Sequence, residues 1–551
     1  MSSPALHLRA PLLWLLGPLM AGLTAARFWP PPVAGLLPLA ILAAVAGLCS
    51  LWLALKPGAA AGVGWGMCLG LATALGGFVL LHSRQPHLHE WGDRPPREIT
   101  VTVRVRQAFP VAPLARSFTG LGVITRTRAL DRDLADRPVY FSAIRRISRP
   151  PARSGSYVMR GVLEPLPRGA GPAAGFNDYL ENLGVHQKLT RVQILREEAP
   201  PGWFEQFCEG AEDRLEKILH YGLKPRPVVD SLYPAMLLGE KAVLSAEQQN
   251  AFMRSGTYHI FSVSGLHVGV IAVALSSVLL LLRLPRRLAL GVSLPVLWLY
   301  VQVTGGSSPA VRAFIMIAFF QGTRVCRLPG NGLAALAASA LVTLLLDPLQ
   351  LFSTGFQMSY AVVLALVVMG APLADRVLRG WRPFALLPRP AWRWQHHLIN
   401  WLGHKLLAAG ATCWTAFLAS APSGIGYFQV LSPGSLLANL IVIPLSSLAI
   451  VGGFLSLLCG LAGLVSLSAL FNSAAAVTII VTDWFVRHGT DLPGVYFPAH
   501  FVQPWLAPAS LAVLTAIMLA GLAGGWSRRY GGFWPPALFI GLLLIFGVKF
   551  G

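Results

Sequence analysis

Charged residues are scarce in this sequence of 551 residues. Only 12% are Asp, Glu, Lys or Arg and 54% are hydrophobic, whereas a soluble globular domain carries about 25% charged residues. This scarcity excludes an ordinary soluble protein, because such a chain needs lipid around it. The apolar residues also form many runs of roughly 20 residues, the length that crosses the hydrocarbon of a bilayer. The composition therefore indicates a polytopic membrane protein.

Several motif classes are missing as well. The six cysteines form no CxxC pair and no Cys/His cluster with metal-ligand spacing. Only Cys208 falls in the predicted soluble region, so that region has no internal disulfide. We find no GxxxxGK[ST] phosphate loop, no HExxH, no GxSxG and no His/Asp cluster suited to two metals. We therefore expect no metal, no cofactor and no enzymatic activity.

The hydropathy pattern predicts about thirteen membrane-spanning helices. Their approximate ranges are 10–26, 33–55, 59–82, 258–282, 287–303, 308–325, 332–347, 354–373, 401–420, 433–455, 465–486, 506–526 and 533–549. The stretch 431–463 is long enough for one helix kinked at Pro444 or for two short helices. The first span can also be read as a signal peptide that ends near Ala26, although two further spans follow it at once.

The positive charge has an asymmetric distribution. If the N-terminus is cytoplasmic, the predicted cytoplasmic segments hold 15 cations and the short loops on the other side hold 3 (Arg27, Arg487 and Lys549). The 15 cations are Arg9, Lys56, Arg283, Arg286, Arg287, Arg324, Arg327, Arg376, Arg379, Arg382, Arg389, Arg393, Lys405, Arg528 and Arg529. This orientation places residues 83–257 and the C-terminus outside the cytoplasm. The net charge of +21 alone does not identify a nucleic-acid partner.

The region after the third span reads as a small soluble β domain. In residues 98–106, apolar residues (Ile99, Val101, Val103, Val105) alternate with polar ones, which is typical of a half-buried strand. Similar runs at 121–129, 138–144, 156–164 and 188–195 complete five short strands, enough for a small barrel. Between Arg84 and Arg168 there are 16 Arg and 7 acidic residues. Either a solvated basic face or an anion-binding groove explains that excess.

Two helical segments follow the strands. Residues 203–220 are rich in Glu and Arg, and Ser245-Ala-Glu-Gln248 has the pattern of a helix capping box. We expect this connector to lie along the membrane interface.

The fourth predicted span begins with polar residues. On a continuous helix, His259 and His267 would be separated by about 12 Å along the axis, too far to share one metal. Ser264 and His267 are three residues apart and would be neighbours, so a serine nucleophile with a histidine base is geometrically possible. However, no acidic partner lies nearby and Gly265 can break the helix. We favour a polar wall or hinge of a conduit.

Other polar residues lie at membrane depth. Arg312 falls about one turn inside the sixth span, where it either snorkels to the interface or faces a pathway for anions. Gln357, Ser359, Asn439 and Asn472 also occur within predicted spans, and hydrogen bonds between helices explain each of them.

The segment Gly256-Thr-Tyr-His-Ile-Phe-Ser-Val-Ser-Gly-Leu-His-Val-Gly269 is similar to a motif, HLLAISGLHVG, of the ComEC family. The members of this family internalise DNA across the inner membrane in bacterial transformation. Weaker matches follow the same order along the chain. They are Leu237–Glu240, Ser308-Pro-Ala-Val-Arg312, Asp347-Pro, Gly355-Phe-Gln-Met-Ser359, Asn439–Pro444 and, in the amino-terminal part, Phe176–Val185. Together they cover roughly residues 30–500. The chain thus resembles the ComEC family.

The resemblance implies an oligonucleotide-binding (OB)-type barrel outside the membrane and a helical conduit for one DNA strand. It assigns phosphate binding to Arg104, Arg106, Arg126 and Arg128. Base stacking could involve Phe109, Phe118, Tyr140 or Tyr157, although aromatic residues of a small barrel are more often core. The sequence has no HxHxDH run, so the nuclease activity of long members with a metallo-β-lactamase-like domain is not transferred to this short form.

The sequence therefore predicts a polytopic α-helical membrane protein with an inserted all-β, OB-like barrel. We expect five parts: three N-terminal helices (1–82), an extracytoplasmic basic barrel (83–200), a helical connector (201–257), a channel domain (258–500) and two C-terminal helices (501–551). The expected function is uptake of single-stranded DNA through the bacterial inner membrane. The alternatives are a permease for small or lipid-linked substrates and a membrane enzyme that uses the Ser264/His267 region.

The expected partners are single-stranded DNA and the lipid bilayer. A separate DNA receptor, a nuclease and a cytoplasmic DNA motor would complete the pathway. The candidate residues of the conduit are His259, Ser264, Gly265, His267, Arg312, Gln357 and Asn439.

Overall fold

The chain is a mostly helical membrane protein. The computed structural model describes residues 11–29, 35–55, 63–84, 95–109, 117–127, 134–144, 151–166, 174–239, 244–261, 263–326, 330–527 and 531–550. Within these residues, seven helices are long and apolar enough to cross a membrane, and five shorter helices are also apolar. The expected membrane class is confirmed, while the count of about thirteen spans stays a prediction.

The soluble domain is a closed five-stranded barrel. Its strands are β1 (Arg97–Ala108), β2 (Ser117–Arg126), β3 (Pro138–Ile144), β4 (Ser156–Pro165) and β5 (Gln187–Ala199). They close in the order β1-β2-β3-β5-β4, with β3 and β5 parallel and the other pairs antiparallel. Every strand overlaps one of the five predicted runs, so the prediction of a small barrel is confirmed.

The barrel encloses an apolar core, as the alternation in β1 predicts. Ile99, Val101, Val103 and Val105 are buried and pack with residues of all other strands. Helix α5 (Ala174–Asn182), between β4 and β5, packs outside the barrel, where Leu180 contacts a cluster around Leu121 of β2. One flank of the barrel is therefore covered by this helix.

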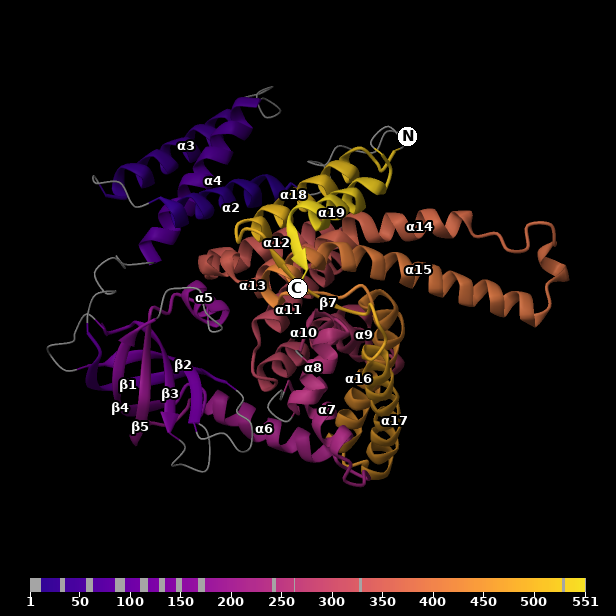
Figure 1. The fold of residues 1–551 in the computed structure, drawn as a ribbon, viewed down its shortest axis with the longest axis horizontal. Helices are drawn as coiled ribbons and strands as arrows, with labels where there is room; N and C mark the ends of the chain where they lie inside the picture. Colours follow the sequence, from indigo (N-terminus) through magenta and orange to yellow (C-terminus); the bar gives the residue numbers. More distant parts are fainter. Residues whose placement is uncertain are drawn as a thin grey trace.

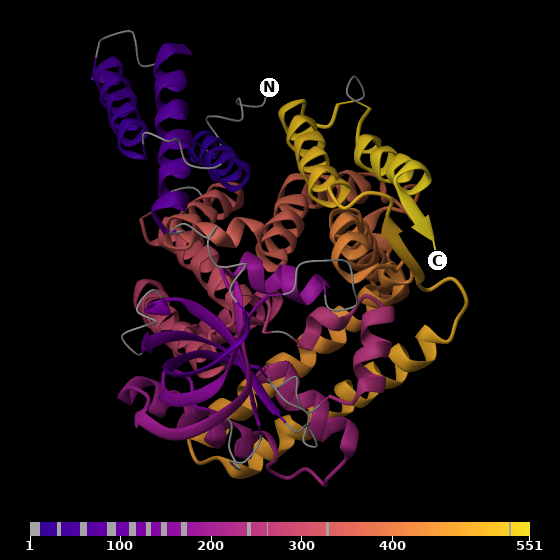
Figure 2. The ribbon, with the colours of Figure 1, turned by 60° about the vertical axis from the view of Figure 1, so that its left-hand side comes forward.

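Three N-terminal helices precede the barrel: α2 (Leu13–Phe28), α3 (Leu37–Leu55) and α4 (Val63–Arg84). They lie together on one side of the molecule, and α4 leads toward the barrel (Figures 1 and 2). A Cβ on Gly22 of α2 would come within 1.8 Å of the carbonyl oxygen of Ala74 in α4, so the two helices need glycine to approach this closely. The side chain of Arg84, at the end of α4, donates a hydrogen bond to the carbonyl of Leu346 in the bundle.

The connector, residues 201–257, contains α6 (Trp203–Leu219), α7 (Pro227–Leu237) and α8 (Ala246–Arg254). The expected capping box is present at α8, because Ser245 accepts from the Gln248 backbone and Gln248 accepts from the Ser245 backbone. Eight residues of α7 are buried, and six of them belong to the main apolar core. The connector is thus an integral part of the helical body as well as a link.

The bundle begins with a one-turn helix, η3 (Tyr258–Phe261), followed by α9 (Gly265–Leu281), α10 (Arg286–Val303), α11 (Ser308–Val325) and α12 (Gly332–Leu346). After η4 (Pro348–Phe352) come α13 (Thr354–Ala365), the π-turn η5 (Leu366–Gly370) and α14 (Ala371–Gly380). The fourth predicted span is therefore interrupted before Gly265, as the glycine suggested.

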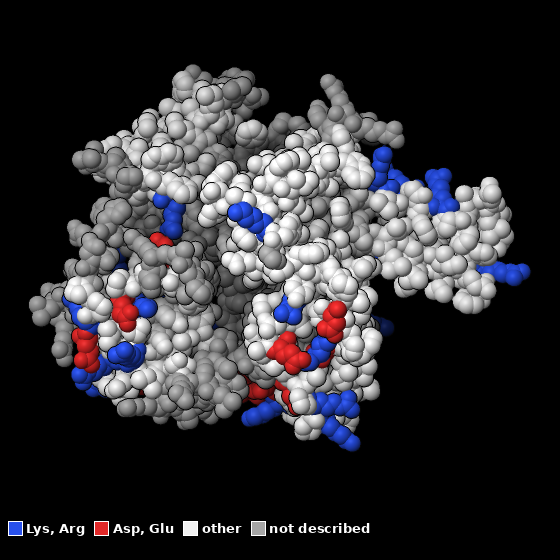
Figure 3. Space-filling model, in the orientation of Figure 1, with Lys and Arg blue, Asp and Glu red and all other residues white. Residues whose placement is uncertain are grey.

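Helices α14 and α15 (Trp394–Ser423) form an arm that projects away from the rest of the molecule (Figure 1). The short turn η6 (Arg389–Ala391) lies in the link at its tip. Figure 3 shows Lys and Arg, and no Asp or Glu, on the visible face of this arm. Such a distribution is typical of the cytoplasmic side of a membrane protein.

The C-terminal part holds α16 (Ser435–Leu461), α17 (Val465–Thr490), α18 (Leu506–Ala523) and α19 (Trp534–Phe546). Residues 431–463 thus contain one long helix with Pro444 inside it. A small sheet joins β6 (Val430–Leu431), β7 (Phe497–Phe501) and β8 (Val548–Phe550) in that order. Strand β6 follows η7 (Gly424–Phe428) at the end of α15, β7 follows α17, and β8 follows α19. Because the three strands pair, the C-terminal ends of these three helices lie on one side of the bundle.

Candidate functional site at the mouth of the bundle

The barrel rests on one end of the bundle. The Arg153 side chain, in the loop before β4, donates a hydrogen bond of 2.9 Å to the carbonyl of Gly305 between α10 and α11. Residues of α5 lie beside η4, and a Cβ on Gly184 would contact Leu349 at 3.2 Å. We call the polar end of α9, α11 and α13, beside these contacts, the mouth.

Three helix N-termini meet at the mouth. Ser307, just before α11, donates from its hydroxyl to the carbonyl of Val263, just before α9, at 3.2 Å. Ser308 donates to the Gln350 side chain in η4, which leads into α13, also at 3.2 Å. The first four N–H groups of a helix lack partners inside the helix and carry about half a positive charge. Their convergence creates an electropositive region suited to anions.

Arg312 adds a full charge to this region. Its side chain is 2% exposed. Nη1 donates to Ser308 Oγ at 2.6 Å and Nη2 donates to the Gly355 carbonyl in the first turn of α13 at 2.8 Å, whereas Nε has no hydrogen-bond partner among the described residues. The guanidinium is therefore held inside the protein by α11 and the first turn of α13, and its depth in the membrane stays a prediction. A buried cation that bonds to a hydroxyl and a carbonyl keeps its positive charge uncompensated, which favours a nearby anion.

Ser264 and His267 lie together at the start of α9. Ser264 is the N-cap residue and its Oγ lies 3.0 Å from Nδ1 of His267, which also accepts a long bond of 3.4 Å from the Ser264 backbone N–H. His267 is fully buried, and its Nε2 has no hydrogen-bond partner within the described chain. The predicted proximity is confirmed, and the arrangement is that of a capping box, in which the ring holds the first turn of α9 in place.

The other predicted conduit residues lie on several different elements. Gln357 in α13 accepts a 2.7 Å bond from the Tyr427 hydroxyl in η7 and donates to the carbonyl of Leu351. A Cβ on Gly265 would contact Ala313 of α11 at 3.6 Å, so α9 and α11 approach closely there. His259 is exposed on η3. Asn439 in α16 has a buried Oδ1 without a hydrogen-bond partner in the described part of the chain.

The basic face predicted for the barrel lies on its outer surface. Arg104 and Arg106 of β1 and Arg126 of β2 are exposed, while Arg128 lies outside the described residues. Arg126 pairs with Glu198 of β5 at 2.6 Å, and Arg160 of β4 pairs with Glu98 at the same distance. Part of the positive charge is therefore balanced by carboxylates.

Two carboxylates that pair with arginines on the barrel surface have a pKa below the ordinary value. A hydrogen bond from Thr102 and the nearby cations Arg126 and Arg196 lower the pKa of Glu198. The hydrogen bond and charge of Arg160 lower the pKa of Glu98. Both groups are thus ionised at neutral pH, and a phosphate that binds Arg126 or Arg160 must compete with them.

The candidate stacking residues divide into two groups. Phe118 and Tyr157 are buried in the barrel core, and the Tyr157 hydroxyl accepts from the Ala152 backbone N–H. Phe109 and Tyr140 are half-buried beside Phe176 of α5, with ring centroids 5.5–6.3 Å apart. Phe176 is 43% exposed, so this second group presents an aromatic edge at the surface.

Sequence reasoning missed several residues of the mouth. Arg153 was counted only as part of the basic excess, and Ser307, Gly355 and Tyr427 were not singled out as partners. The Arg312 partner Gly355 lies 43 residues away in sequence. The available signal was the set of serines that precede α9, α11 and α13, since serine is preferred at helix N-caps. Among the described residues, no group of three or more His, Cys, Asp and Glu side chains could hold a metal ion.

Comparison with known proteins identifies relatives of the helical part. A family model described as "Competence protein" matches residues 236–523. ComE operon protein 3 of Bacillus subtilis (strain 168) is 27% identical over 219 residues, which cover 38% of this chain and 27% of that protein. Competence protein ComA of Neisseria gonorrhoeae is 30% identical over 236 residues, which cover 41% of this chain and 32% of that protein. No solved structure matches the chain.

The family model begins at the end of α7 and includes α8, the mouth and the helices through α18. This match covers more than half of the 551 residues, although the aligned part spans only about a third or less of the two curated relatives. The chain therefore belongs to the competence protein family, as its resemblance to ComEC proteins implied.

Proposed function

We propose that this protein takes up single-stranded DNA through a bacterial inner membrane during transformation. The single observation that carries the proposal is the electropositive mouth, where the N-termini of α9, α11 and α13 meet around buried Arg312 next to the barrel. A polyanion is the substrate class that such a site attracts. The description of the matching family and the name of one curated relative, Competence protein ComA, both refer to competence, which supports a role in transformation.

In this proposal the parts have separate tasks. The barrel lies outside the cytoplasm and captures the strand with Arg104, Arg106 and Arg126 and with the aromatic edge at Phe176. The helices from 258 to 500 form the conduit, the N-terminus is cytoplasmic, and the chain crosses the membrane up to thirteen times. The driving force comes from separate proteins, and a nuclease and a DNA receptor are separate partners as well.

Uptake of labelled DNA by a deletion strain tests the proposal. We expect wild-type protein to restore uptake and Arg312→Gln to restore little, because the amide removes the charge at the mouth. The exposed His259 provides a second variant, His259→Ala, which should reduce uptake if this residue lines the path. Immunoblotting of membranes checks that all proteins are present. Unchanged uptake with both variants at wild-type abundance would refute a path through the mouth.

A membrane hydrolase is the second candidate, because Ser264 Oγ lies within 3.0 Å of His267 Nδ1. A nucleophile at position 264 needs the serine hydroxyl, which an asparagine amide cannot replace, whereas an N-cap can also be asparagine. Ser264→Asn therefore separates the two roles. Retained uptake with this variant would support the capping role, and complete loss with both Ser264→Asn and Ser264→Ala at normal abundance would favour the hydrolase.

A further inference from the structure

The hairpin of α16 and α17 follows the connector along its whole length. At the loop of the hairpin, a Cβ on Gly460 would contact Ile218 of α6, and Asn472 donates hydrogen bonds to the carbonyls of Ile218 and Tyr221. Farther along α16, a Cβ on Gly453 would come within 2.1 Å of the Leu237 side chain of α7, and the Tyr233 hydroxyl of the same helix also donates to the Asn472 side chain at 2.9 Å. The connector therefore accompanies this hairpin from its loop toward its open end.

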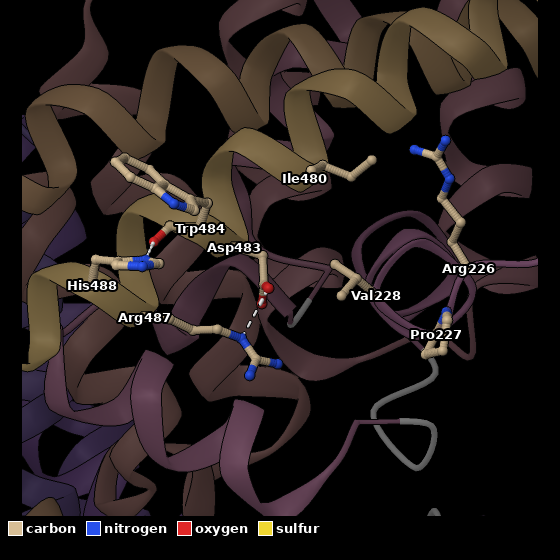
Figure 4. A pocket seen from close by; sticks show the side chains of 8 residues that line it. All are labelled: Arg226, Pro227, Val228, Ile480, Asp483, Trp484, Arg487 and His488. Carbon is tan, nitrogen blue, oxygen red and sulfur yellow. Dashed lines mark hydrogen bonds and ion pairs between the residues drawn. The ribbon is translucent and has the colours of Figure 1, made fainter.

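The open end of the hairpin contacts the connector too. Arg487 of α17 pairs with Glu247 of α8 at 3.0 Å and with Asp483 at 2.9 Å. Figure 4 shows Asp483, Arg487 and His488 on α17 beside a pocket whose other wall is formed by Arg226, Pro227 and Val228 at the start of α7. Opposite ends of a hairpin about 40 Å long are thus both in contact with residues 201–257.

The connector itself does not cross a membrane. Helix α6 is tied to the barrel, because Ser154 donates to Glu205, and it carries exposed charged residues (Asp213, Arg214 and Lys217) near its far end. Its two ends therefore share the aqueous compartment of the barrel. Helix α7 has 11 residues and is about 16 Å long, which is too short for the roughly 30 Å of hydrocarbon. Consequently α8 lies on the same side as α6.

We propose that α16 and α17 do not span the membrane, and that both ends of this hairpin lie on the side of the barrel. One face of the hairpin binds the connector. The other face is apolar and contacts the acyl chains of the leaflet on that side. Both helices satisfy the length and hydropathy expected of spans, so the topology is inferred from the contacts of the connector with both ends of the hairpin and not from composition.

Two further observations agree with this topology. Leu437 and Leu448 of α16 and Leu470 and Val477 of α17 are 60–71% exposed and need lipid around them. The loop Leu461–Leu464 contains no Lys or Arg, whereas each of the other predicted cytoplasmic segments contains at least one. Omitting two spans keeps the predicted total odd, so the C-terminus stays on the side of the barrel.

Accessibility of introduced cysteines tests the proposal in the full-length protein with its six cysteines replaced. Ala462→Cys reports the hairpin loop, Ser142→Cys the barrel and Ala391→Cys the tip of the arm. We expect a membrane-impermeant maleimide to label Ala462→Cys and Ser142→Cys in intact cells, and Ala391→Cys only after permeabilisation. The proposal would be overturned if Ala462→Cys, like Ala391→Cys, were labelled only after permeabilisation while Ser142→Cys was labelled in intact cells.

A reporter inserted after Ala462 gives an independent decision if the maleimide does not reach this loop. Alkaline phosphatase activity equal to that of an insertion in the barrel is expected, and fluorescence of an inserted green fluorescent protein would refute the topology.

A photoreactive benzoylphenylalanine at Leu448 tests the lipid face. Crosslinking to phospholipid is expected, and a crosslinked dimer of the chain or a crosslink to another protein would refute lipid as the occupant.

Discussion

The barrel and the bundle hold their cations in opposite ways. On the barrel, Arg126 has a side chain that is 79% exposed and it pairs with Glu198. In the bundle, Arg312 is 2% exposed and bonds to a hydroxyl and a carbonyl. Exposed pairs contribute about 0–1 kcal/mol and exchange partners easily, whereas a charge buried at membrane depth is costly and fixed. Under the proposed function, this difference assigns reversible capture to the barrel and a permanent positive potential to the mouth.

Removal of the buried charge should have the largest effect. We expect Arg312→Met to lower DNA uptake by roughly 30-fold, because a unit charge near a passing phosphate contributes about 2 kcal/mol at an effective dielectric constant near 20. Arg312→Lys keeps the charge and should retain most of the uptake. Uptake is measured with labelled DNA at matched protein abundance. Equal uptake by the Met variant and the wild type would remove the distinction between mouth and barrel.

The cap of α9 should have the next largest effect. Ser264→Ala removes the N-cap and is expected to destabilise the protein by about 1 kcal/mol. Thermal unfolding of the detergent-solubilised protein measures this change, with Ser264→Asn as a control that keeps an acceptor at the N-cap. If alanine and asparagine lowered the transition temperature equally, the capping role of the Ser264–His267 pair would be wrong.

Arg104 and Arg106, which have no carboxylate partner among the described residues, should affect DNA binding more than a paired arginine does. We expect the double variant Arg104→Gln/Arg106→Gln to weaken binding of single-stranded DNA and to reduce the salt slope by about 1.4, since each lost phosphate contact contributes about 0.7. Arg160→Gln, which removes a residue paired with Glu98, is the matched control and should change the slope less. Titrations of full-length protein in nanodiscs measure both. Identical slopes for all proteins would exclude the barrel from capture.

The carboxylates of the barrel should have the smallest and opposite effect. Glu198→Gln frees Arg126 and should tighten DNA binding by about twofold to fivefold, in the range of an exposed ion pair. Because the pKa of Glu198 is lowered in the folded protein, its stabilising contribution is complete above the ordinary carboxyl pKa and is lost as pH falls through the folded pKa. For the Glu198→Gln variant, the free energy of unfolding should therefore decrease less with falling pH in the acid range than it does for the wild type. Weaker DNA binding by this variant would reverse the assigned role.

The barrel was predictable because its signal is local. The period of two in residues 98–106 places Ile99 and Val101 inside and Arg104 outside without any knowledge of the partner strands. The stacking residues were harder to assign, because Phe118 and Phe109 differ only in the environment that the fold gives them. Phe118 lies in the core, and Phe109 packs under α5, a helix from a different part of the chain.

The mouth was only partly predictable. The spacing of Ser264 and His267 gave their contact, and Gly265 gave the break in the helix. By contrast, the bonds from Arg312 to Gly355 and from Arg153 to Gly305 join residues 43 and 152 positions apart. The burial of α7 also depends on tertiary packing, since its sequence alone does not distinguish an interfacial helix from a buried one.

The most direct test of the account is photocrosslinking of DNA at the mouth during uptake. Tyr427 is 39% exposed and bonds to Gln357 in α13, so a benzoylphenylalanine at this position would report a strand that passes there. Leu448 on the apolar face of α16 serves as the control. We expect labelled single-stranded DNA to crosslink at position 427 and not at position 448. Continued uptake without any crosslink at position 427 would contradict a path through the mouth.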